Sequence, residues 1–390
     1  MAFSEETTPD VDGITDTIQT ALTAAGLNAH SESMQSVTNL IRQTLSGCRI
    51  SAPSTSADRA TIVLPGSERI RTRPFLPTSA QAGRAEQQYP GEFANRAFTS
   101  AAGTLNYKLY IPLSYAARPA EKFPLIVMLH GCTQSPDDFA AGTRMNELAE
   151  THGFLVVYPA QAATANGAKC WNWFRPEDQA RDRGEPSLIA STTQDVAGRY
   201  RVDERRIFVA GLSAGAAMSV VLGATYPELY AAVGAHSGLA YGAAHDTPSA
   251  LGAMRGGSPA IGTPNVPGRQ VRHPSLSHSV PTIVFHGTGD GTVNVRNGMD
   301  IIDQATMSGK GKAHLHLSVE PGVASNGGTY TRTVYADENR RPVIEHWLLH
   351  GAGHAWSGGS SRGSFTDPRG PDASSEMIRF FYSQQAWNVE

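Results

Sequence analysis

The chain has 390 residues, and its 32 Lys and Arg against 35 Asp and Glu give a formal net charge of −3. This balance excludes the strongly basic surface of a nucleic-acid-binding protein. No stretch reaches the roughly 18 uninterrupted apolar residues of a transmembrane helix, so no membrane partner is expected either. The composition, 40% apolar and 17% charged, is that of a globular protein of enzyme size, and the length fits one large domain with an appendage.

The first residues, MAFSEETTPDVDG, are acidic and lack the basic start and apolar core of a signal peptide. A cytoplasmic protein is therefore the default expectation. Secretion is the alternative, because the given sequence could lack a leader peptide that was removed.

Three segments of the chain differ in composition and in the spacing of their apolar residues. Residues 1–50 carry apolar side chains at helical spacing with a break near Gly26, which predicts a small helical segment. Residues 51–95 are rich in Pro, Ser, Thr and Arg, and the prolines block regular helix, so a linker or a strap on the main domain is expected. Residues 96–390 are expected to form the catalytic domain.

In this last segment, short unbroken apolar runs alternate with stretches of helical period, which predicts a mostly parallel α/β sheet flanked by helices. The predicted strands are 106–111, 125–130, 155–158, 207–210, 231–235, 282–286 and 343–349. The predicted helices are 137–152, 189–200, 214–225 and 372–381.

The sequence Gly-Leu-Ser213-Ala-Gly stands between a predicted strand and a helix of small residues. A serine nucleophile needs this context, because a tight strand-to-helix turn holds its hydroxyl clear of the backbone and leaves no room for side chains on its neighbours. A small residue in a tight turn is the alternative interpretation. A second match to the pattern, around Ser361, lies in a polar Gly/Ser stretch and is expected to be a loop.

A serine hydroxyl needs a base, and the base needs an orienting acid. Asp290 follows the predicted strand 282–286 in a Gly-rich turn, and His354 follows the predicted strand 343–349 in another. Both positions lie at the sheet edge where ligands bind in open α/β sheets, so they are the predicted acid and base. The competing residues are expected to be surface acids or structural histidines; they are Asp246, Asp300, Asp303, His346 and His350.

The tetrahedral intermediate of acyl transfer requires two backbone N–H groups aimed at its negative oxygen. The residue after the nucleophile, Ala214, supplies one, and Cys132 in the turn after the strand 125–130 is the predicted second. A purely structural turn at Gly131 is the alternative.

Several motifs in matching order carry a family resemblance. They are HGCTQ at 130–134, CWNWF at 170–174, GLSAGAAM at 211–218, HSG at 236–238 and HGAGHAWSGG at 350–359. Over about residues 98–387 the chain resembles the esterase/poly(3-hydroxybutyrate) depolymerase family of α/β-hydrolases, whose relatives include feruloyl and acetylxylan esterases. The resemblance implies the α/β-hydrolase fold, a Ser213, Asp290, His354 triad, an oxyanion hole at Cys132 and Ala214, and an aromatic substrate groove. The stretch 241–280 departs from the family's pattern, and it is expected to be either a lid over the site or a surface loop.

Two tryptophans and two cysteines flank the predicted site loops. Trp171 and Trp173 are expected to form an exposed aromatic wall for the substrate, with core packing as the alternative. Cys132 and Cys170 form either a disulfide that pins the oxyanion loop or two free thiols. The histidines lack metal-ligand spacing, so no metal and no cofactor is expected.

The leading hypothesis is a serine esterase that hydrolyses poly- or oligo(3-hydroxybutyrate) and short-chain esters through an acyl-enzyme. The alternative is a carbohydrate esterase of the feruloyl or acetylxylan type. A non-catalytic binding scaffold predicts a broken triad, and a serine peptidase ranks low because no pocket for a peptide amine is evident. Acyl length, polymer preference and oligomeric state are left open.

Overall fold

The computed structural model describes residues 89–100, 102–256, 280–307 and 315–384. The predicted helical segment 1–50 and residues 51–88 of the predicted linker lie outside these ranges. So does most of the stretch 241–280, from residue 257 to residue 279. All the described residues belong to the compact unit Gln81–Glu390.

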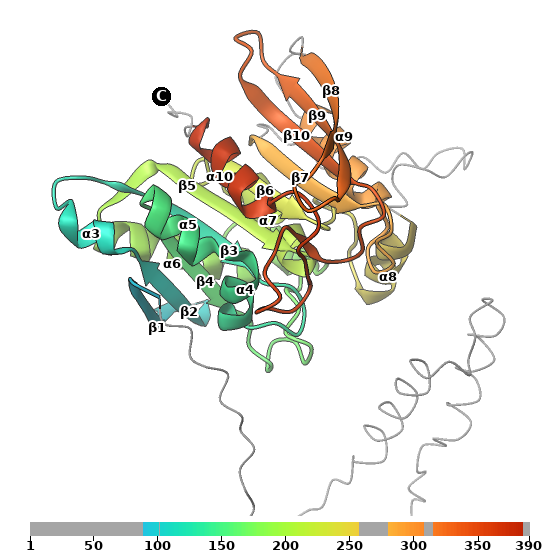
Figure 1. Cartoon of the computed structure of the whole chain (residues 1–390). Helices are drawn as coiled ribbons and strands as arrows, with labels where there is room; N and C mark the ends of the chain where they lie inside the picture. Colours follow the sequence, from blue (N-terminus) through green and yellow to red (C-terminus); the bar gives the residue numbers. More distant parts are fainter. Residues whose placement is uncertain (1–88, 101, 257–279, 308–314, 385–390) are drawn as a thin grey trace, which may run out of the picture. The chain divides into compact units, whose positions relative to one another are not determined.

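A ten-stranded sheet forms the centre of the described chain (Figure 1), with the order β1-β2-β4-β3-β5-β6-β7-β10-β9-β8. Its six middle strands, β4 to β10 in this order, run parallel, and an antiparallel pair continues the sheet at each end. All seven predicted strands are confirmed, within a few residues at their ends. The strands are β1 Glu92–Ser100, β2 Gly103–Ile111, β3 Phe123–Leu129, β4 Leu155–Ala160, β5 Val202–Leu212, β6 Ala232–His236, β7 Thr282–Gly287, β8 His316–Val323, β9 Thr329–Ala336 and β10 Pro342–Leu349.

Three strands of the sheet were not predicted, namely β1, β8 and β9. β1 pairs with β2 from Glu92 to Ser100, so the sheet begins inside the segment expected to be linker up to residue 95. β1 and β8 are edge strands whose residues are mostly exposed. An edge strand with little burial needs no unbroken apolar run, so the apolar pattern of the sequence does not reveal it.

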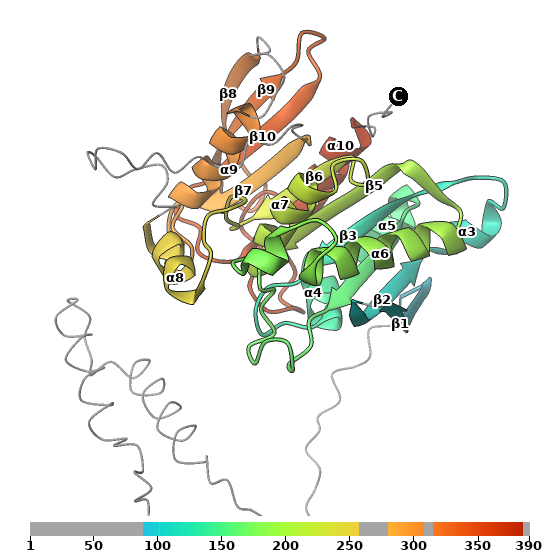
Figure 2. The ribbon, with the colours of Figure 1, turned by 180° about the vertical axis from the view of Figure 1, so that it is seen from behind.

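Helices cover both faces of the sheet. α4, α5 and α10 lie on the face toward the viewer in Figure 1, and α6 and α7 lie on the opposite face in Figure 2. Two small strands, β11 (Trp356–Ser357) and β12 (Thr366–Asp367), pair with each other in the loop before α10. The helices are α3 Leu113–Ala117, α4 Pro136–Thr143, α5 Met145–His152, α6 Gly184–Arg199, α7 Ala214–Thr225, α8 Thr247–Gly256, α9 Arg296–Met307 and α10 Ala373–Tyr382.

The strand β3 shows how this layering follows from the sequence. All seven residues of Phe123–Leu129 are buried. Leu125 and Val127 join the core cluster that includes α6 and α7, whereas Ile126 and Met128 join the cluster that includes α4, α5 and α10. Because successive side chains of a strand point to opposite faces, an unbroken apolar run is what a strand between two helical layers requires.

The segment predicted as one helix, residues 137–152, is two helices that meet at Arg144. This residue has a left-handed backbone with φ 56°, which ends α4 and begins α5. Its guanidinium donates to the Asp372 carboxylate at 2.6 Å and to the Gly358 carbonyl at 3.1 Å. These contacts, more than 200 residues away along the chain, stabilise a break that the apolar spacing does not reveal.

Candidate active site

The predicted site residues all follow the carboxyl ends of parallel strands. Cys132 comes after β3, Ser213 after β5, Asp290 after β7 and His354 after β10. Since these strands run in the same direction, their carboxyl ends meet at one edge of the sheet, where open α/β sheets bind ligands.

Ser213 occupies a strained turn between β5 and α7. Its backbone has φ 59° and ψ −120°, and its N–H donates to the His236 carbonyl at 2.9 Å. A Cβ added to Gly211 would lie 2.4 Å from the carbonyl carbon of Gly215, and one added to Gly215 would lie 2.1 Å from the Leu129 carbonyl oxygen. Both glycines are therefore needed for the close approach of strand and helix, as the nucleophile interpretation requires.

Asp290 and His354 are in direct contact. The His354 Nδ1 and the Asp290 Oδ2 lie 2.7 Å apart, and the N–H groups of Thr292 and Val293 donate to the other carboxylate oxygen at 2.9 and 2.8 Å. Burial alone would raise the pKa of Asp290, but the hydrogen bond and charge of His354 and the two N–H donors outweigh it and lower this pKa to about 2. Asp290 is therefore ionised at neutral pH and accepts from His354.

The second contact of the expected triad, between Ser213 and His354, is not made. Among the described residues, no hydrogen bond joins the Ser213 hydroxyl to the His354 ring. Such contacts often tighten only when substrate is bound.

The turn after β3 lies directly against Ser213. A Cβ added to Gly131 would be 3.6 Å from the Ser213 Cβ. Gly131 donates its N–H to the Gln134 side chain at 2.9 Å, and Thr133 has a left-handed backbone with φ 67°. Ala214 is the first residue of α7, so its N–H is one of the helix-terminal donors without an intrahelical acceptor. These positions suit an oxyanion hole formed by Ala214 and Cys132.

The expectation of an exposed aromatic wall is wrong. Trp171 is 1% exposed and Trp173 is 5% exposed, and both belong to the core cluster on the α6 and α7 face. The Trp171 indole N–H donates to the His130 carbonyl at 3.0 Å, and Trp173 packs edge-on against Phe174. The polar turn before these residues suggested exposure, but the indole N–H finds its acceptor inside the protein, which is what a buried tryptophan needs.

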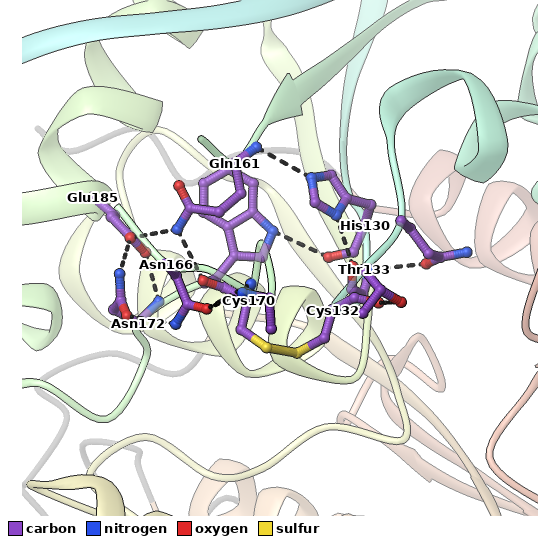
Figure 3. Close-up of a disulfide and its surroundings, with 12 residues drawn as sticks. His130, Cys132, Thr133, Gln161, Asn166, Cys170, Asn172 and Glu185 are labelled. Atoms are coloured by element: carbon purple, nitrogen blue, oxygen red, sulfur yellow. Dashed lines mark hydrogen bonds between the residues drawn. A yellow bond between two sulfur atoms is a disulfide. The ribbon is translucent and has the colours of Figure 1, made fainter. Parts of the chain in front are cut away.

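Of the two alternatives for the cysteines, the structure has the disulfide (Figure 3). Cys132 and Cys170 are bonded, with their Cα atoms 4.2 Å apart. The bond connects the turn after β3 to the segment that follows β4. Cys48 lies outside the described residues.

Two of the competing residues have structural partners. Asp246 accepts from the Ser249 N–H at the start of α8, and the His350 ring lies 2.9 Å from the Thr331 hydroxyl. His346 is buried, as expected for a structural histidine. Asp300 was expected at the surface, which is wrong: it is buried and bonded to Arg296 at 2.9 Å, because α9 turns this position inward. Ser361 lies in an exposed turn, as predicted.

One residue near the site was missed, namely Glu185 in the first turn of α6. It accepts three hydrogen bonds from the segment after β4. No local motif identifies it, because its partners are up to 24 residues away in the sequence. Only the fold brings them together.

Comparison with known proteins shows the fold and the family of this chain. The acetyl xylan esterase from Aspergillus awamori, an 18% identical solved structure, has a TM-score of 0.53 and covers 74% of this chain and 99% of its own. This likeness shows the α/β-hydrolase fold. Residues 105–310, more than half of the chain, match the family profile described as Esterase PHB depolymerase, and the chain belongs to that family.

Two curated relatives extend the comparison. Poly(3-hydroxyalkanoate) depolymerase C of Paucimonas lemoignei is 34% identical over 59% of this chain and 54% of its own length. Feruloyl esterase B of Neurospora crassa is 30% identical over 63% of this chain and 81% of its own length. The chain thus spans about half the length of the first of these relatives. No described helix is long and apolar enough to cross a membrane.

Proposed function

We propose that this protein is a serine esterase in which Ser213, His354 and Asp290 form the catalytic triad. The observation that carries the proposal is the 2.7 Å contact between His354 and the buried, ionised Asp290, at the sheet edge where Ser213 stands on its strained turn. An imidazole oriented in this way accepts a proton on its free nitrogen, and the adjacent carboxylate stabilises the resulting cation.

In the proposed reaction, the Ser213 oxygen attacks the carbonyl carbon of the ester and its proton passes to His354. The N–H groups of Cys132 and Ala214 hydrogen-bond the oxyanion of the tetrahedral intermediate. The bond to the leaving alcohol breaks, and the alcohol takes the proton from His354. Water then attacks the acyl group, gives a proton to His354, and releases the carboxylic acid as Ser213 regains its proton.

The proposed substrates are poly- or oligo(3-hydroxybutyrate) and short-chain esters. The first curated relative is named a poly(3-hydroxyalkanoate) depolymerase, which supports this choice. The second candidate is a carbohydrate ester, since other relatives are named feruloyl and acetylxylan esterases. We also propose that residues 96–390, extended to the start of β1, form the catalytic domain.

The disulfide supports a proposal for the location of the protein. Disulfides persist in oxidising compartments and are rare in the cytosol. The bond between Cys132 and Cys170 therefore favours an exported protein over the cytoplasmic default.

Turnover of three substrate classes tests the proposal. The wild-type protein, Ser213→Ala and the control Ser361→Ala are assayed on hydroxybutyrate oligomers, a feruloyl ester and acetylated xylan. We expect Ser213→Ala to abolish hydrolysis and Ser361→Ala to retain it, with the highest kcat/KM on the oligomers. A higher kcat/KM on either carbohydrate ester selects the second candidate. Absence of turnover on every ester leaves the binding-scaffold alternative.

A further inference from the structure

The carboxylate of Glu185 holds together the two ends of one segment. Gln161 and Asn172 bound the segment that follows β4. Their side-chain amides donate to the Glu185 Oε1 at 2.5 and 2.6 Å, and the Asn172 backbone N–H donates to Oε2 at 2.7 Å. All three partners are donors, so the ionised carboxylate matches them (Figure 3).

Between these ends, the segment contacts the turn that lies against Ser213. The disulfide bonds Cys170 to Cys132, and the Thr133 N–H donates to the carbonyl of Ala168 at 2.7 Å. Neither contact involves Glu185 itself. The disulfide therefore fixes the predicted oxyanion residue Cys132 relative to the segment, and the hydrogen bond fixes its neighbour Thr133.

Two further contacts reach His130, the residue at the start of that turn. The Gln161 N–H donates to the His130 Nε2 at 3.1 Å, and the Trp171 indole N–H donates to the His130 carbonyl at 3.0 Å. Burial lowers the pKa of His130 to about 4, so its ring is neutral and accepts. The Gln161 side chain also donates to the Cys170 carbonyl at 2.9 Å, which joins one end of the segment to the disulfide.

Glu185 is held in place by the helix α6. Glu185 lies in the first turn of α6, and its own N–H donates to the Asp178 carboxylate at 2.7 Å. α6 packs into the core through Ile189 and Ala190, which are 0% and 1% exposed. The favourable position of a negative charge at a helix N-terminus adds to the stability of the ionised Glu185.

We propose that Glu185 is a positioning residue for the oxyanion hole, acting on the Cys132 N–H through the segment 161–172. The inference rests on the proposed esterase function. Glu185 itself touches no reacting atom. It fixes Gln161 and Asn172, and the segment between them fixes the turn through the disulfide and the hydrogen bonds to His130 and Thr133.

The test compares Glu185→Gln with Glu345→Gln in the full-length protein. Glu345 is fully buried and bonded to Arg332 and Arg379, so the control also removes a buried negative charge, but on β10 and away from this turn. Burial, reinforced by Asp178, raises the pKa of Glu185 to about 7, so assays are run at pH 8.5, where the wild-type carboxylate is ionised. The probes are a p-nitrophenyl butyrate ester, a trifluoromethyl ketone that forms a tetrahedral adduct with the serine, and hydrogen exchange of the peptide containing residues 130–135.

An amide at position 185 presents a donor to donors, so we expect Glu185→Gln to free the segment and the turn. We expect kcat to fall about 10- to 100-fold with KM changed less than about threefold, since one misplaced oxyanion donor costs up to 10²–10³ in rate. The trifluoromethyl ketone should bind more weakly by a similar factor, and residues 130–135 should exchange faster. Glu345→Gln should change none of these.

Three results would overturn the inference. They are an unchanged exchange of residues 130–135 in Glu185→Gln, a loss of rate expressed in KM alone, and equal losses of kcat in Glu185→Gln and Glu345→Gln. Failure of the proposed function looks different: wild-type protein then hydrolyses no ester, whereas the exchange readout still reports whether Glu185 holds the turn.

Discussion

Removal of the disulfide should destabilise the protein and weaken its oxyanion turn. The double substitution Cys132→Ala and Cys170→Ala keeps both backbone N–H groups and leaves no unpaired thiol from this pair. The bonded residues are 38 positions apart in sequence. In the chain-entropy account, a crosslink that closes a loop of this length stabilises the folded state by about 4 kcal/mol.

This value is an upper estimate, because other contacts hold the same two segments together. The Thr133 N–H still donates to Ala168, and Trp171 still donates to His130, when the sulfur bridge is gone. For a folded unit of this size, a loss of about 4 kcal/mol corresponds to a fall in Tm of roughly 10 °C. We expect kcat to decrease several-fold as well, since the turn that carries the Cys132 N–H loses its covalent connection.

Urea unfolding of the wild-type and double-variant proteins, with kcat on a short-chain ester, measures both effects. Thiol titration of the denatured, unreduced protein is the companion assay. The sequence has three cysteines, so the disulfide predicts one reactive thiol before reduction and three afterwards. Three thiols before reduction would show that the disulfide does not form, and a double variant as stable as the wild type would show that it does not stabilise the fold.

Three more predictions concern stability and domain organisation. Burial lowers the pKa of His346 to about 4, so unfolding takes up a proton as the pH falls below about 6.5. His346→Phe should therefore reduce the slope of unfolding free energy against pH by about 1 kcal/mol per unit between pH 4.5 and 6, and parallel curves would contradict this. Trp173→Ala should lower the unfolding free energy by about 3 to 5 kcal/mol, because the ring is buried. The same substitution should reduce kcat/KM by similar factors for acetate and oligomeric esters. A loss confined to large esters would instead support a role of Trp173 in the substrate groove. A chain that starts at residue 89 should keep wild-type kcat/KM on a soluble ester, since every proposed catalytic group follows Gly131, and a folded but inactive truncation would show otherwise.

The parallel core and the order of the site loops could be predicted from the sequence, because each depends on local patterns. β3, β7 and residues 207–212 of β5 are buried on both faces and therefore read as unbroken, mostly apolar runs. The glycines around Ser213 are required by a close approach of strand and helix that the motif itself encodes. The proximity of Asp290 and His354 could also be predicted, because parallel strands place their carboxyl ends at the same edge of the sheet.

The remaining features depend on contacts between distant residues, which local patterns do not contain. The break at Arg144 is stabilised by Asp372, and the burial of Trp171 depends on the carbonyl of His130. Glu185 has no recognisable motif, since its role in the structure comes from the segment that folds over it.

Covalent labelling tests whether Ser213 is the activated nucleophile. A fluorophosphonate ester phosphonylates an activated serine and stops at that stage, so the mass of the intact protein counts the adducts and peptide mapping locates them. We predict one adduct, on Ser213, that is absent from Ser213→Ala and forms far more slowly in His354→Ala. An adduct on Ser361, or a Ser213→Ala protein that is still labelled and still hydrolyses esters, would show that Ser213 is not the nucleophile.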